Sequence, residues 1–246
     1  GDEHRVANRS DFKKIEVGAL IAGGGIAGSA LFRYMADSGL NPVLVNADRG
    51  SSWRNIGGGR TAFSLPELAE IAEHNHAIFK ELQKISNIDY KTTRYINLAH
   101  DEPTFNALNA SRAWSDAYMV DPKNFQKEIS PYFSTKSKRY LGALITNDCW
   151  QATPGKVVDL VRNMGISAGG RIVEDCKVLE VMKEGSTYSI LVLTHDKKYV
   201  EFRTEIFVNA LGAGAGKICE GLGIHAGLYP VRHQAFIARR LPMLGK

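Results

Sequence analysis

The stretch Ala22-Gly-Gly-Gly-Ile-Ala-Gly28 follows the apolar run Val17–Ile21 and leads into a segment that can wind as a helix. Its glycines have the spacing Gly23-x-Gly25-x-x-Gly28. Between a strand and a helix, the first such glycine allows a sharp turn, the second lets backbone approach a pyrophosphate, and the third lets helix and strand pack closely. Amides at the helix start then face the phosphates, because unpaired N–H groups and the helix dipole favour negative charge. The stretch therefore predicts a dinucleotide-binding turn.

The residues around this turn predict a βαβ unit. A buried strand is expected over 17–22, a helix over Ile26–Ser38, and a second apolar strand over Val43–Asn46. Near the other end of the chain, the run Ile206–Leu211 meets the small-residue turn Gly212–Gly216 before another helical pattern. We therefore expect an α/β fold with a Rossmann-like domain.

Further patterns predict the elements between these two units. Ser64–Glu67 has the spacing of a capping box and precedes a long amphipathic helix. Shorter helices are expected over Asp121–Ile129 and over residues 154–164. A β-meander is expected from three β-rich runs, Arg171–Met182, Tyr188–Thr194 and Tyr199–Phe202. No obvious flexible linker separates these pieces, so the region to about residue 225 is expected to form one packed unit.

The composition of the 246 residues, 44% hydrophobic and 23% charged, is typical of a globular protein with a real core. No apolar stretch reaches the roughly 20 residues that a membrane span needs. The polar start of the chain lacks the apolar centre of a secretory signal, although a processed precursor would look the same. The net charge of +5 comes from lysines and arginines spread singly, so no nucleic-acid partner is expected.

Neither a metal site nor a disulfide framework is predicted. Cys149, Cys176 and Cys219 are scattered, odd in number and without a CxxC pair. His74 and His76 lie two positions apart on a predicted helix and cannot share a face as metal ligands would. Both histidines are expected to be surface or structural residues. A reducing compartment fits this cysteine usage, and we expect a cytoplasmic protein.

The end of the second strand raises a question about ribose recognition. A nucleotide-binding βαβ unit usually ends this strand in an acidic residue that binds the ribose hydroxyls. Here that position is Asn46, whose amide has one acceptor oxygen and no charge. Asp48, just beyond Ala47, could reach the ribose instead. Both residues stay open as ribose ligands.

Several motifs together resemble one family. GGGIAG at 23–28 is followed by Ser51–Gly59, much later by Val208–Gly214, and by GlyLeuTyrProValArgHisGlnAlaPheIle at 227–237. The combination resembles the D-amino-acid oxidase superfamily of FAD enzymes, and within it D-amino-acid dehydrogenases of the D-arginine dehydrogenase type. This resemblance implies FAD as cofactor, a small amine or amino acid as substrate, and hydride transfer from the substrate to flavin N5, giving an imine. It also implies a mixed-sheet substrate domain beside the FAD-binding domain.

The resemblance further implies which residues bind the cofactor. The loop matching Ser51–Asn55 lies along the flavin and its phosphates in relatives, the Val178 position offers backbone to the adenine, and the Ala210–Gly214 turn lies close to the cofactor. Arg232 starts a strand beside the substrate in relatives and could grip a carboxylate with two hydrogen bonds. Arg232 is thus the catalytic-site candidate, and an ordinary strand-edge arginine is the alternative. The full set of expected cofactor contacts is Gly23, Gly25, Ile26, Ala27, Gly28, Asn46, Ala47, Asp48, Ser51, Ser52, Arg54, Asn55, Val178, Ala210, Gly212 and Gly214.

Two departures from the family pattern qualify these expectations. Gly58 and Phe63 stand where the D-arginine enzymes have histidine and tyrosine, which puts recognition of a basic amino acid in doubt and favours a less polar substrate. Relatives also continue further, with most of the substrate sheet and a second carboxylate-binding arginine, so we expect this chain to be a fragment of a longer one. The alternative is an unusual short relative that cannot close its active site.

The expected domains follow from the same comparison. Residues 1–14 form a polar extension, 15–225 the FAD-binding domain, and 226–246 the first strand or strands of the substrate domain. A segment at about 86–150 is expected to belong partly to the substrate domain.

Two other functions stay open. A flavin-fold module that binds nucleotide or a partner protein without turnover is motivated by Asn46, Gly58 and the missing C-terminal part. An FAD-dependent tRNA wobble-base modification enzyme is weakly permitted by the net charge of +5. The oligomeric state is not predicted.

Overall fold

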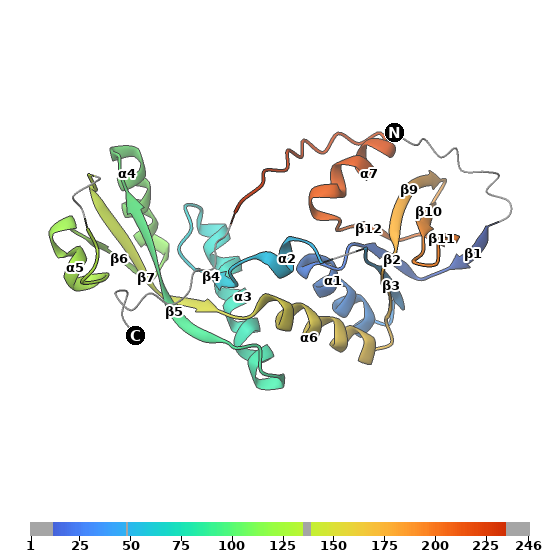
Figure 1. Ribbon diagram of the computed structural model, residues 1–246, viewed down its shortest axis with the longest axis horizontal. Coiled ribbons are helices and arrows are strands. Elements are labelled where there is room, and N and C mark those ends of the chain that lie inside the picture. Colours follow the sequence, from blue (N-terminus) through green and yellow to red (C-terminus); the bar gives the residue numbers. More distant parts are fainter. Residues whose placement is uncertain (1–11, 48, 135–138, 235–246) are drawn as a thin grey trace. The chain divides into compact units, whose positions relative to one another are not determined.

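A parallel sheet is built around the strand that precedes the glycine turn. The computed structural model describes residues 12–47, 49–134 and 139–234 (Figure 1). β2 (Ala19–Ala22) is fully buried, and so is β3 (Pro42–Val45). With β8 (Arg171–Val173) and β12 (Phe207–Asn209) they form a sheet of order β12-β2-β3-β8, in which every pairing is parallel. Apolar runs without alternation are typical of such doubly covered strands, so the predicted Rossmann-like core is confirmed.

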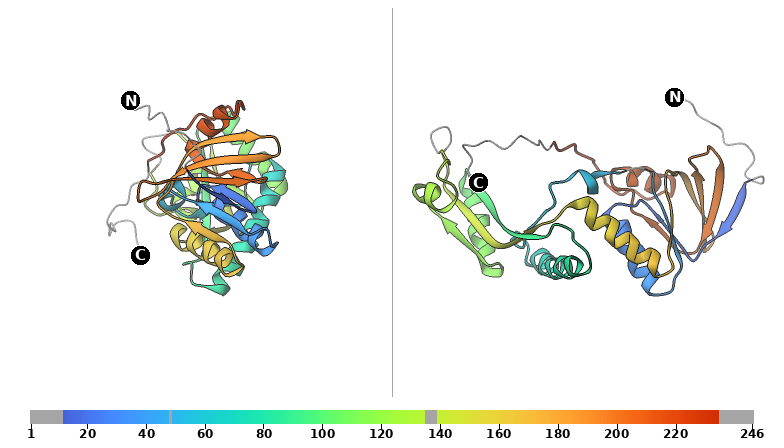
Figure 2. Two further views of the ribbon diagram at one scale, coloured as in Figure 1. Left: turned by 90° about the vertical axis from the view of Figure 1, so that its right-hand side faces the viewer. Right: turned by 60° about the horizontal axis from the view of Figure 1, so that its bottom comes forward.

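The helix after the glycine turn is α1 (Ile26–Asp37), which ends one residue earlier than predicted, with Ser38 as its C-cap. α6 (Pro154–Ser167) is longer than the predicted 154–164. Figures 1 and 2 show α1 and the later turns of α6 side by side, and their contact is close at Gly165, where an added Cβ would overlap the ring of Phe32. The last helix, α7 (Ala215–Gly221), follows the 3₁₀ turn η4 (Gly212–Gly214), as expected for the second strand-turn-helix.

A second sheet holds the predicted meander. β9 (Lys177–Glu184), β10 (Thr187–Leu193) and β11 (Tyr199–Thr204) are antiparallel neighbours, and β1 (Lys13–Glu16) pairs with β11 in parallel. The predicted β-rich run Arg171–Met182 is divided between two sheets, because its first residues form β8 of the parallel sheet and not part of the meander.

The start of the chain also differs from the prediction. The polar extension was expected to reach residue 14, but Lys13 and Lys14 already belong to β1. Residues 1–11 of that extension lie outside the described part of the chain.

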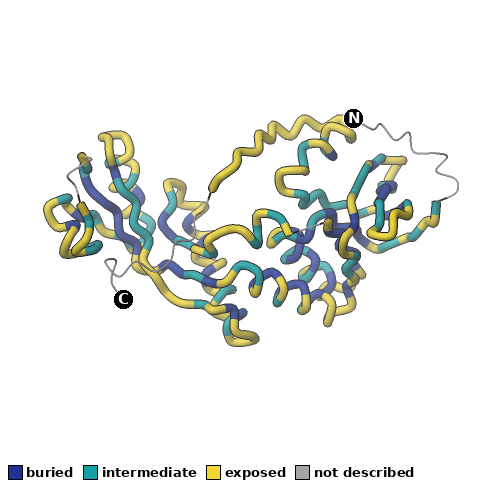
Figure 3. The backbone as a smooth tube through the Cα atoms, in the orientation of Figure 1, coloured by how far each residue is buried: buried dark blue, intermediate teal, exposed yellow. Residues whose placement is uncertain are grey.

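Side-chain alternation explains how the layers stack. Leu20, Val43 and Val45 belong to a core cluster shared with the meander sheet. Ile21 and Leu44, the intervening positions, cluster instead with Phe32 of α1. Because successive strand residues point to opposite faces, the parallel sheet lies between α1 and the meander. Every residue of β2 and β3 is buried, as the burial colouring of Figure 3 illustrates.

Residues Ile56–Lys156 form a separate unit, together with Gln234 among the described residues, while the first unit comprises the residues up to Asn55 and Val157–His233. The second unit thus begins well before the expected segment 86–150. Its centre is β7 (Gly142–Gln151), which pairs antiparallel with β5 (Lys91–Ala99) on one edge. On the other edge it pairs with β6 (Ala117–Val120) and with β4 (Gly58–Gly59).

The helices of the second unit are α3 (Pro66–Ile85), α4 (Glu102–Ala110) and α5 (Phe125–Glu128), with 3₁₀ turns at η2 (Ser111–Trp114) and η3 (Pro122–Asn124). The predicted long helix and the short helix after Asp121 are therefore confirmed. The capping box at Ser64–Glu67 is wrong, since the N-cap of α3 is Leu65 and makes no side-chain cap bond. Pro66 in the first turn begins this helix instead.

His76 has a structural environment, as expected. It is 2% exposed, its Nε2 lies 2.7 Å from the Tyr90 hydroxyl, and its ring stacks on Trp150 at 4.4 Å. Its Nδ1 lies 3.3 Å from a carboxylate oxygen of Asp148. Among the described residues, no group of three or more His, Cys, Asp or Glu side chains could hold a metal ion. Within the same residues, no helix has the length and apolar character needed to cross a bilayer.

The three cysteines are free, so the predicted lack of a disulfide framework holds for the described structure. Cys149 and Cys176 are buried, and burial raises the pKa of both thiols. Cys219 is half-buried in α7.

Because the thiolate is the reactive form, iodoacetamide at pH 8 is expected to alkylate Cys219 well before the other two cysteines. Mass spectrometry of peptides from the native protein measures the order, with urea-unfolded protein as the control in which all three react. Early modification of Cys149 would contradict the buried position of β7.

Candidate dinucleotide-binding site

Gly23 makes the sharp turn that the spacing predicts. Its φ is +105°, a conformation that L side chains rarely adopt, and an added Cβ would run into the carbonyl of Ala210. The Gly23 N–H donates to the Val45 carbonyl at 2.8 Å, and the Ala210 N–H donates to the Ala22 carbonyl at 2.8 Å. The turn is therefore fixed between β3 and the segment that follows β12.

The other two glycines of the motif differ in what surrounds them. At Gly28 an added Cβ would overlap the Gly23 carbonyl oxygen and lie 3.2 Å from the Ala210 Cβ, so this glycine serves the packing of helix against turn. At Gly25 the backbone has φ −67° and ψ −176°, which any residue can adopt. An added Cβ there would lie 2.9 Å from the Ser52 hydroxyl oxygen. The backbone at Gly25 therefore does not require glycine, but the missing side chain leaves space for a ligand beside Ser52 Oγ. We call this space the cradle at Gly25.

The start of α1 has the properties of an anion site. Gly25 is its N-cap and supplies no side-chain bond, and the first turn contains no acidic residue. The Ile26 N–H donates to Ser52 Oγ at 3.0 Å, which leaves the Ser52 hydroxyl hydrogen available to a further acceptor. The first N–H groups of a helix have no intrahelical partner, and the dipole of this 12-residue helix adds positive potential. The cradle at Gly25 therefore fits a pyrophosphate.

Asn46 is held tightly beside this turn. It is 8% exposed, and its Oδ1 accepts a hydrogen bond from the Gly24 N–H at 3.1 Å. Its Nδ2 donates to Glu174 Oε2 at 2.9 Å. The amide thus links the glycine turn to the residue that follows β8.

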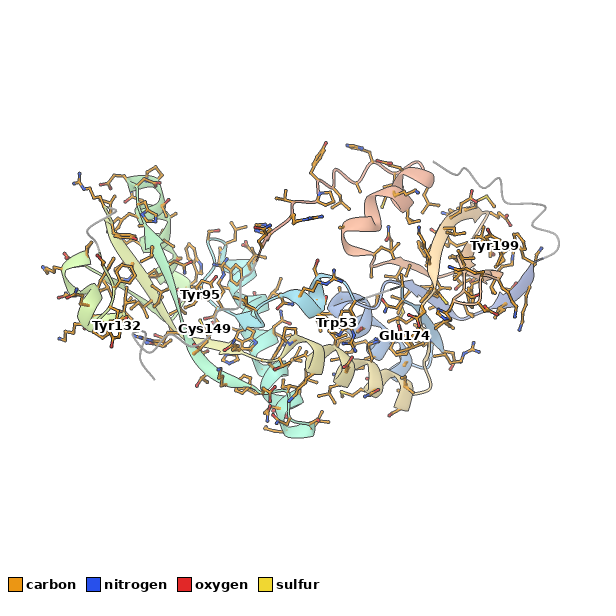
Figure 4. All side chains as sticks on the ribbon, viewed as in Figure 1. Trp53, Tyr95, Tyr132, Cys149, Glu174 and Tyr199 are labelled. Atoms are coloured by element: carbon orange, nitrogen blue, oxygen red, sulfur yellow. The ribbon has the colours of Figure 1, made fainter. Side chains whose placement is uncertain are left out.

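Glu174 and Arg162 are a pair that the sequence did not reveal. Arg162 Nη2 forms an ion pair with Glu174 Oε1, and its guanidinium carbon lies 5.9 Å from the centre of the Trp53 ring. The buried Arg162 Nε and Trp53 Nε1 have no hydrogen-bond partner within the described structure. Figure 4 labels Trp53 and Glu174, which come from α2 and from the end of β8. A carboxylate at the end of a third parallel strand was the available signal, and it was missed because the whole run Arg171–Met182 was assigned to the meander.

The predicted flavin loop forms a short helix, α2 (Ser51–Arg54). Asn55 Nδ2 donates to the Ser52 carbonyl at 2.8 Å and so helps to close this turn. The Ser52 hydroxyl is brought to the start of α1, whereas Arg54 is exposed. Ala47 is exposed just after Asn46, and Asp48 lies outside the described residues.

The remaining predicted contacts come from the second half of the chain. Ala210 lies against both Gly23 and Gly28, and the turn with Gly212 and Gly214 follows it directly. Val178 lies in β9 opposite Val192, and its side chain packs against the core of the first unit.

Arg232 lies in the segment 224–234, which has no regular secondary structure, and it is exposed. The strand expected from residue 226 is therefore absent up to residue 234, and residues 235–246 lie outside the described part.

The second unit contains a pocket of about 160 Å³. Its wall includes Arg60, whose guanidinium lies 4.7 Å from the centre of the Phe63 ring and 5.2 Å from that of Tyr95. Phe63, which stands where the D-arginine type has tyrosine, is thus part of a pocket whose wall also includes a cation. Sequence reasoning missed Arg60, because its partners lie on separate strands and turns.

Comparisons with known proteins agree with this geometry. The chain is similar to anaerobic glycerol-3-phosphate dehydrogenase subunit A1 of Haloferax volcanii, with 26% identity over 240 residues, covering 86% of this chain and 39% of that protein. Its fold is similar to L-proline dehydrogenase from P. horikoshii, with a TM-score of 0.71 and 21% identity, covering 87% of this chain and 57% of that one. Glycine oxidase from Geobacillus kaustophilus gives a TM-score of 0.69 and 18% identity, covering 85% and 58%.

This chain therefore spans between about two fifths and three fifths of the length of these proteins. The family of FAD dependent oxidoreductases called DAO matches residues 19–245, nearly the whole chain. The predicted fold class and the predicted cofactor of the family, FAD, are thereby confirmed. With its glycine turn, its parallel sheet and this match, the chain belongs to the DAO family of FAD dependent oxidoreductases.

Proposed function

We propose that this chain is the FAD-binding part of an oxidoreductase that oxidises an amine or an amino acid. The observation that carries the proposal is the cradle at Gly25, where the start of α1 and the Ser52 hydroxyl converge. Solved structures with the same fold include L-proline dehydrogenase and glycine oxidase, which supports an amino-acid substrate.

Each element of the site has a role in this proposal. The backbone amides of Ile26 and Ala27 and the Ser52 hydroxyl would bind the pyrophosphate, with Gly25 giving it room. The turn from Ala210 to Gly214 would lie along the cofactor, and the Val178 backbone would contact the adenine. The contacts of Arg54 and Asn55 with the flavin stay predictions from the family resemblance.

The chemistry divides between cofactor and protein. When bound, FAD would accept a hydride, which carries both electrons, from the substrate carbon, while the amine nitrogen loses a proton and an imine forms. The protein then needs to orient the substrate and exclude water rather than supply a nucleophile. Arg232 would orient an amino-acid substrate by binding its carboxylate through two hydrogen bonds.

A second candidate substrate is glycerol 3-phosphate. The similarity to the Haloferax volcanii subunit, at 26% identity, favours it. An amino acid and glycerol 3-phosphate both carry an anionic group and an oxidisable C–H bond, so FAD chemistry alone does not separate them. The protein side chains that contact the anionic group of the substrate and its reacting carbon would decide between the two substrates.

The test uses the full-length protein under nitrogen. Wild-type protein is expected to be yellow, and its flavin absorbance is expected to bleach with one class from a panel of D- and L-amino acids, simple amines and glycerol 3-phosphate. Bleaching by glycerol 3-phosphate alone would replace the amine proposal with the second candidate. A colourless protein that does not take up added FAD would overturn both and favour a non-catalytic module.

Arg232→Ala in the full-length protein is expected to raise the apparent KM for an amino-acid substrate by about 10- to 100-fold. The reason is the loss of a charge-assisted bidentate contact, of order 1.5–3 kcal/mol. Steady-state kinetics measure this change, with a neutral amine that lacks the carboxylate as the control substrate. Equal losses for both substrates would show that Arg232 supports the fold or the flavin instead.

A further inference from the structure

We propose that Glu174 binds the adenosine ribose hydroxyls with its carboxylate. It would thereby replace the acidic residue that usually ends the second strand, where this chain has Asn46. The inference rests on the proposed FAD binding and deepens it by assigning a residue to one part of the nucleotide. It differs from the expectation that Asn46 or Asp48 is the ribose ligand.

The backbone fixes the segment around Glu174 against Asn46 from both sides. The Asn46 N–H donates to the Val173 carbonyl at 3.0 Å, and the Cys176 N–H donates to the Asn46 carbonyl at 3.0 Å. Asp175 in between has φ +54°, which makes the turn out of β8. Glu174 is therefore held at the carboxyl end of the parallel sheet, next to the position where the family pattern places an acid.

The side chain of Asn46 is already engaged. Its oxygen accepts from the Gly24 N–H at 3.1 Å and its amino group donates to Glu174 at 2.9 Å. That oxygen keeps one lone pair for a ribose hydroxyl, and the hydroxyl would meet no charge there. The role that the structure gives Asn46 is to connect the glycine turn with the carboxylate.

Glu174 retains more acceptor capacity than Asn46, and it carries a charge. Among the described residues, each of its two oxygens has one partner, Arg162 on Oε1 and Asn46 on Oε2, and a carboxylate has about four acceptor sites. Its side chain is 48% exposed, so solvent or a ligand can reach the remaining sites. Two vicinal hydroxyl groups would find two acceptor oxygens with a negative charge.

Arg162 makes this carboxylate a positioned group rather than a mobile surface one. The Arg162 side chain is 10% exposed, and it lies between Glu174 and the Trp53 ring. Because two partners hold the Glu174 oxygens, the side chain loses little further rotational freedom when a ligand binds. Arg162 is thus a positioning residue for Glu174.

The experiment measures ribose discrimination directly. Binding of ADP and of 2′,3′-dideoxy-ADP to wild type and to Glu174→Gln is compared by isothermal titration calorimetry. Wild type is expected to bind ADP at least about tenfold more tightly than the dideoxy analogue, since charge-assisted hydrogen bonds to the hydroxyls are lost. In Glu174→Gln this preference is expected to fall below about threefold.

Two controls separate ribose binding from support of the fold. Glu205→Gln neutralises an exposed carboxylate in the turn before β12 and is expected to keep the full ADP preference. Glu174→Asp keeps a charge for Arg162 but withdraws the oxygens by one methylene, and it is expected to lose part of the preference. If Glu174→Gln does not fold, as judged by circular dichroism, the aspartate variant decides.

The outcomes distinguish this inference from the proposed function. Wild type that binds neither FAD nor ADP would overturn the proposed function. Wild type that binds both but does not distinguish the dideoxy analogue would overturn only the role of Glu174, and so would a Glu174 variant that keeps the preference. Loss of the preference in Asp48→Asn, with Glu174→Gln unchanged, would assign the ribose to Asp48 instead.

Discussion

Gly25→Val is expected to weaken FAD binding by at least about 100-fold while leaving the melting temperature of the protein nearly unchanged. The backbone at Gly25, with φ −67° and ψ −176°, accepts a β-branched residue without strain. The added Cβ would lie 2.9 Å from Ser52 Oγ, and valine would add two methyl groups to the space where phosphate meets the start of α1. Fluorescence titration with FAD and a thermal melt by circular dichroism measure the two quantities.

Two other glycines serve as matched controls for this prediction. Gly221→Val places the same side chain where an added Cβ meets nothing within 4 Å, and it is expected to keep FAD affinity. Gly28→Ala places a Cβ against the Gly23 carbonyl and is expected to lower the melting temperature together with FAD affinity. Stoichiometric FAD in Gly25→Val would remove the glycine turn from the site.

The local signals of the first unit explain why so much of it could be predicted. The strand β2, the turn at Gly23 and the helix α1 each have a short-range cause: an apolar run, a backbone that needs φ above zero, and a periodic pattern. The second strand-turn-helix, ending in α7, has the same kind of cause. These elements are adjacent in the sequence, so their contacts need no long-range information.

The sheet of the second unit could not be predicted for the opposite reason. β5 has four of its nine residues exposed and shows no clean alternation, and its partner β7 lies more than 40 residues further along the chain. Its register is set by cross-strand packing and by pairing with β6, which no single segment encodes. Only the helices beside this sheet had local signals, from Pro66 and from Asp121-Pro122.

Some residues of the candidate site could be predicted from the sequence and others could not, for the same reason. The glycines, Ser52 and Ala210 came from motifs, and the structure places them together. Glu174 and Arg162 came from no motif, because the bond between Asn46 and Glu174 joins residues 128 positions apart. A residue that replaces a missing acid from another strand can be found only when the sheet order is known.

Phe32→Ala is expected to destabilise the protein by about 3–5 kcal/mol, the usual cost of removing a large buried aromatic side chain. Phe32 is fully buried and connects α1 with Ile21 and Leu44 of the parallel sheet. Urea unfolding followed by circular dichroism measures the change in the free energy of unfolding. Tyr34→Ala, on the same helix but 51% exposed, is the control and is expected to cost less than about 1 kcal/mol.

Two glycines, Gly165 and Gly170, pack against the Phe32 ring. An added Cβ at Gly165 would overlap the Phe32 ring, and one at Gly170 would lie 2.5 Å from it. Gly165→Ala alone is therefore expected to cost about 1–3 kcal/mol by overpacking. In the double variant Phe32→Leu/Gly165→Ala, the new methyl group enters space that the ring has left. The loss of unfolding free energy in the double variant is therefore expected to be smaller than the sum of the losses in the two single variants, by at least about 0.5 kcal/mol. Strict additivity would mean that α6 moves away from α1 rather than packing against it.

A loss below about 1 kcal/mol in Phe32→Ala would contradict the burial of this ring. The first turn of α1 holds the proposed pyrophosphate site. The FAD affinity of these variants is therefore expected to stay near that of wild type if the unfolding data show that α1 and α6 still pack against each other.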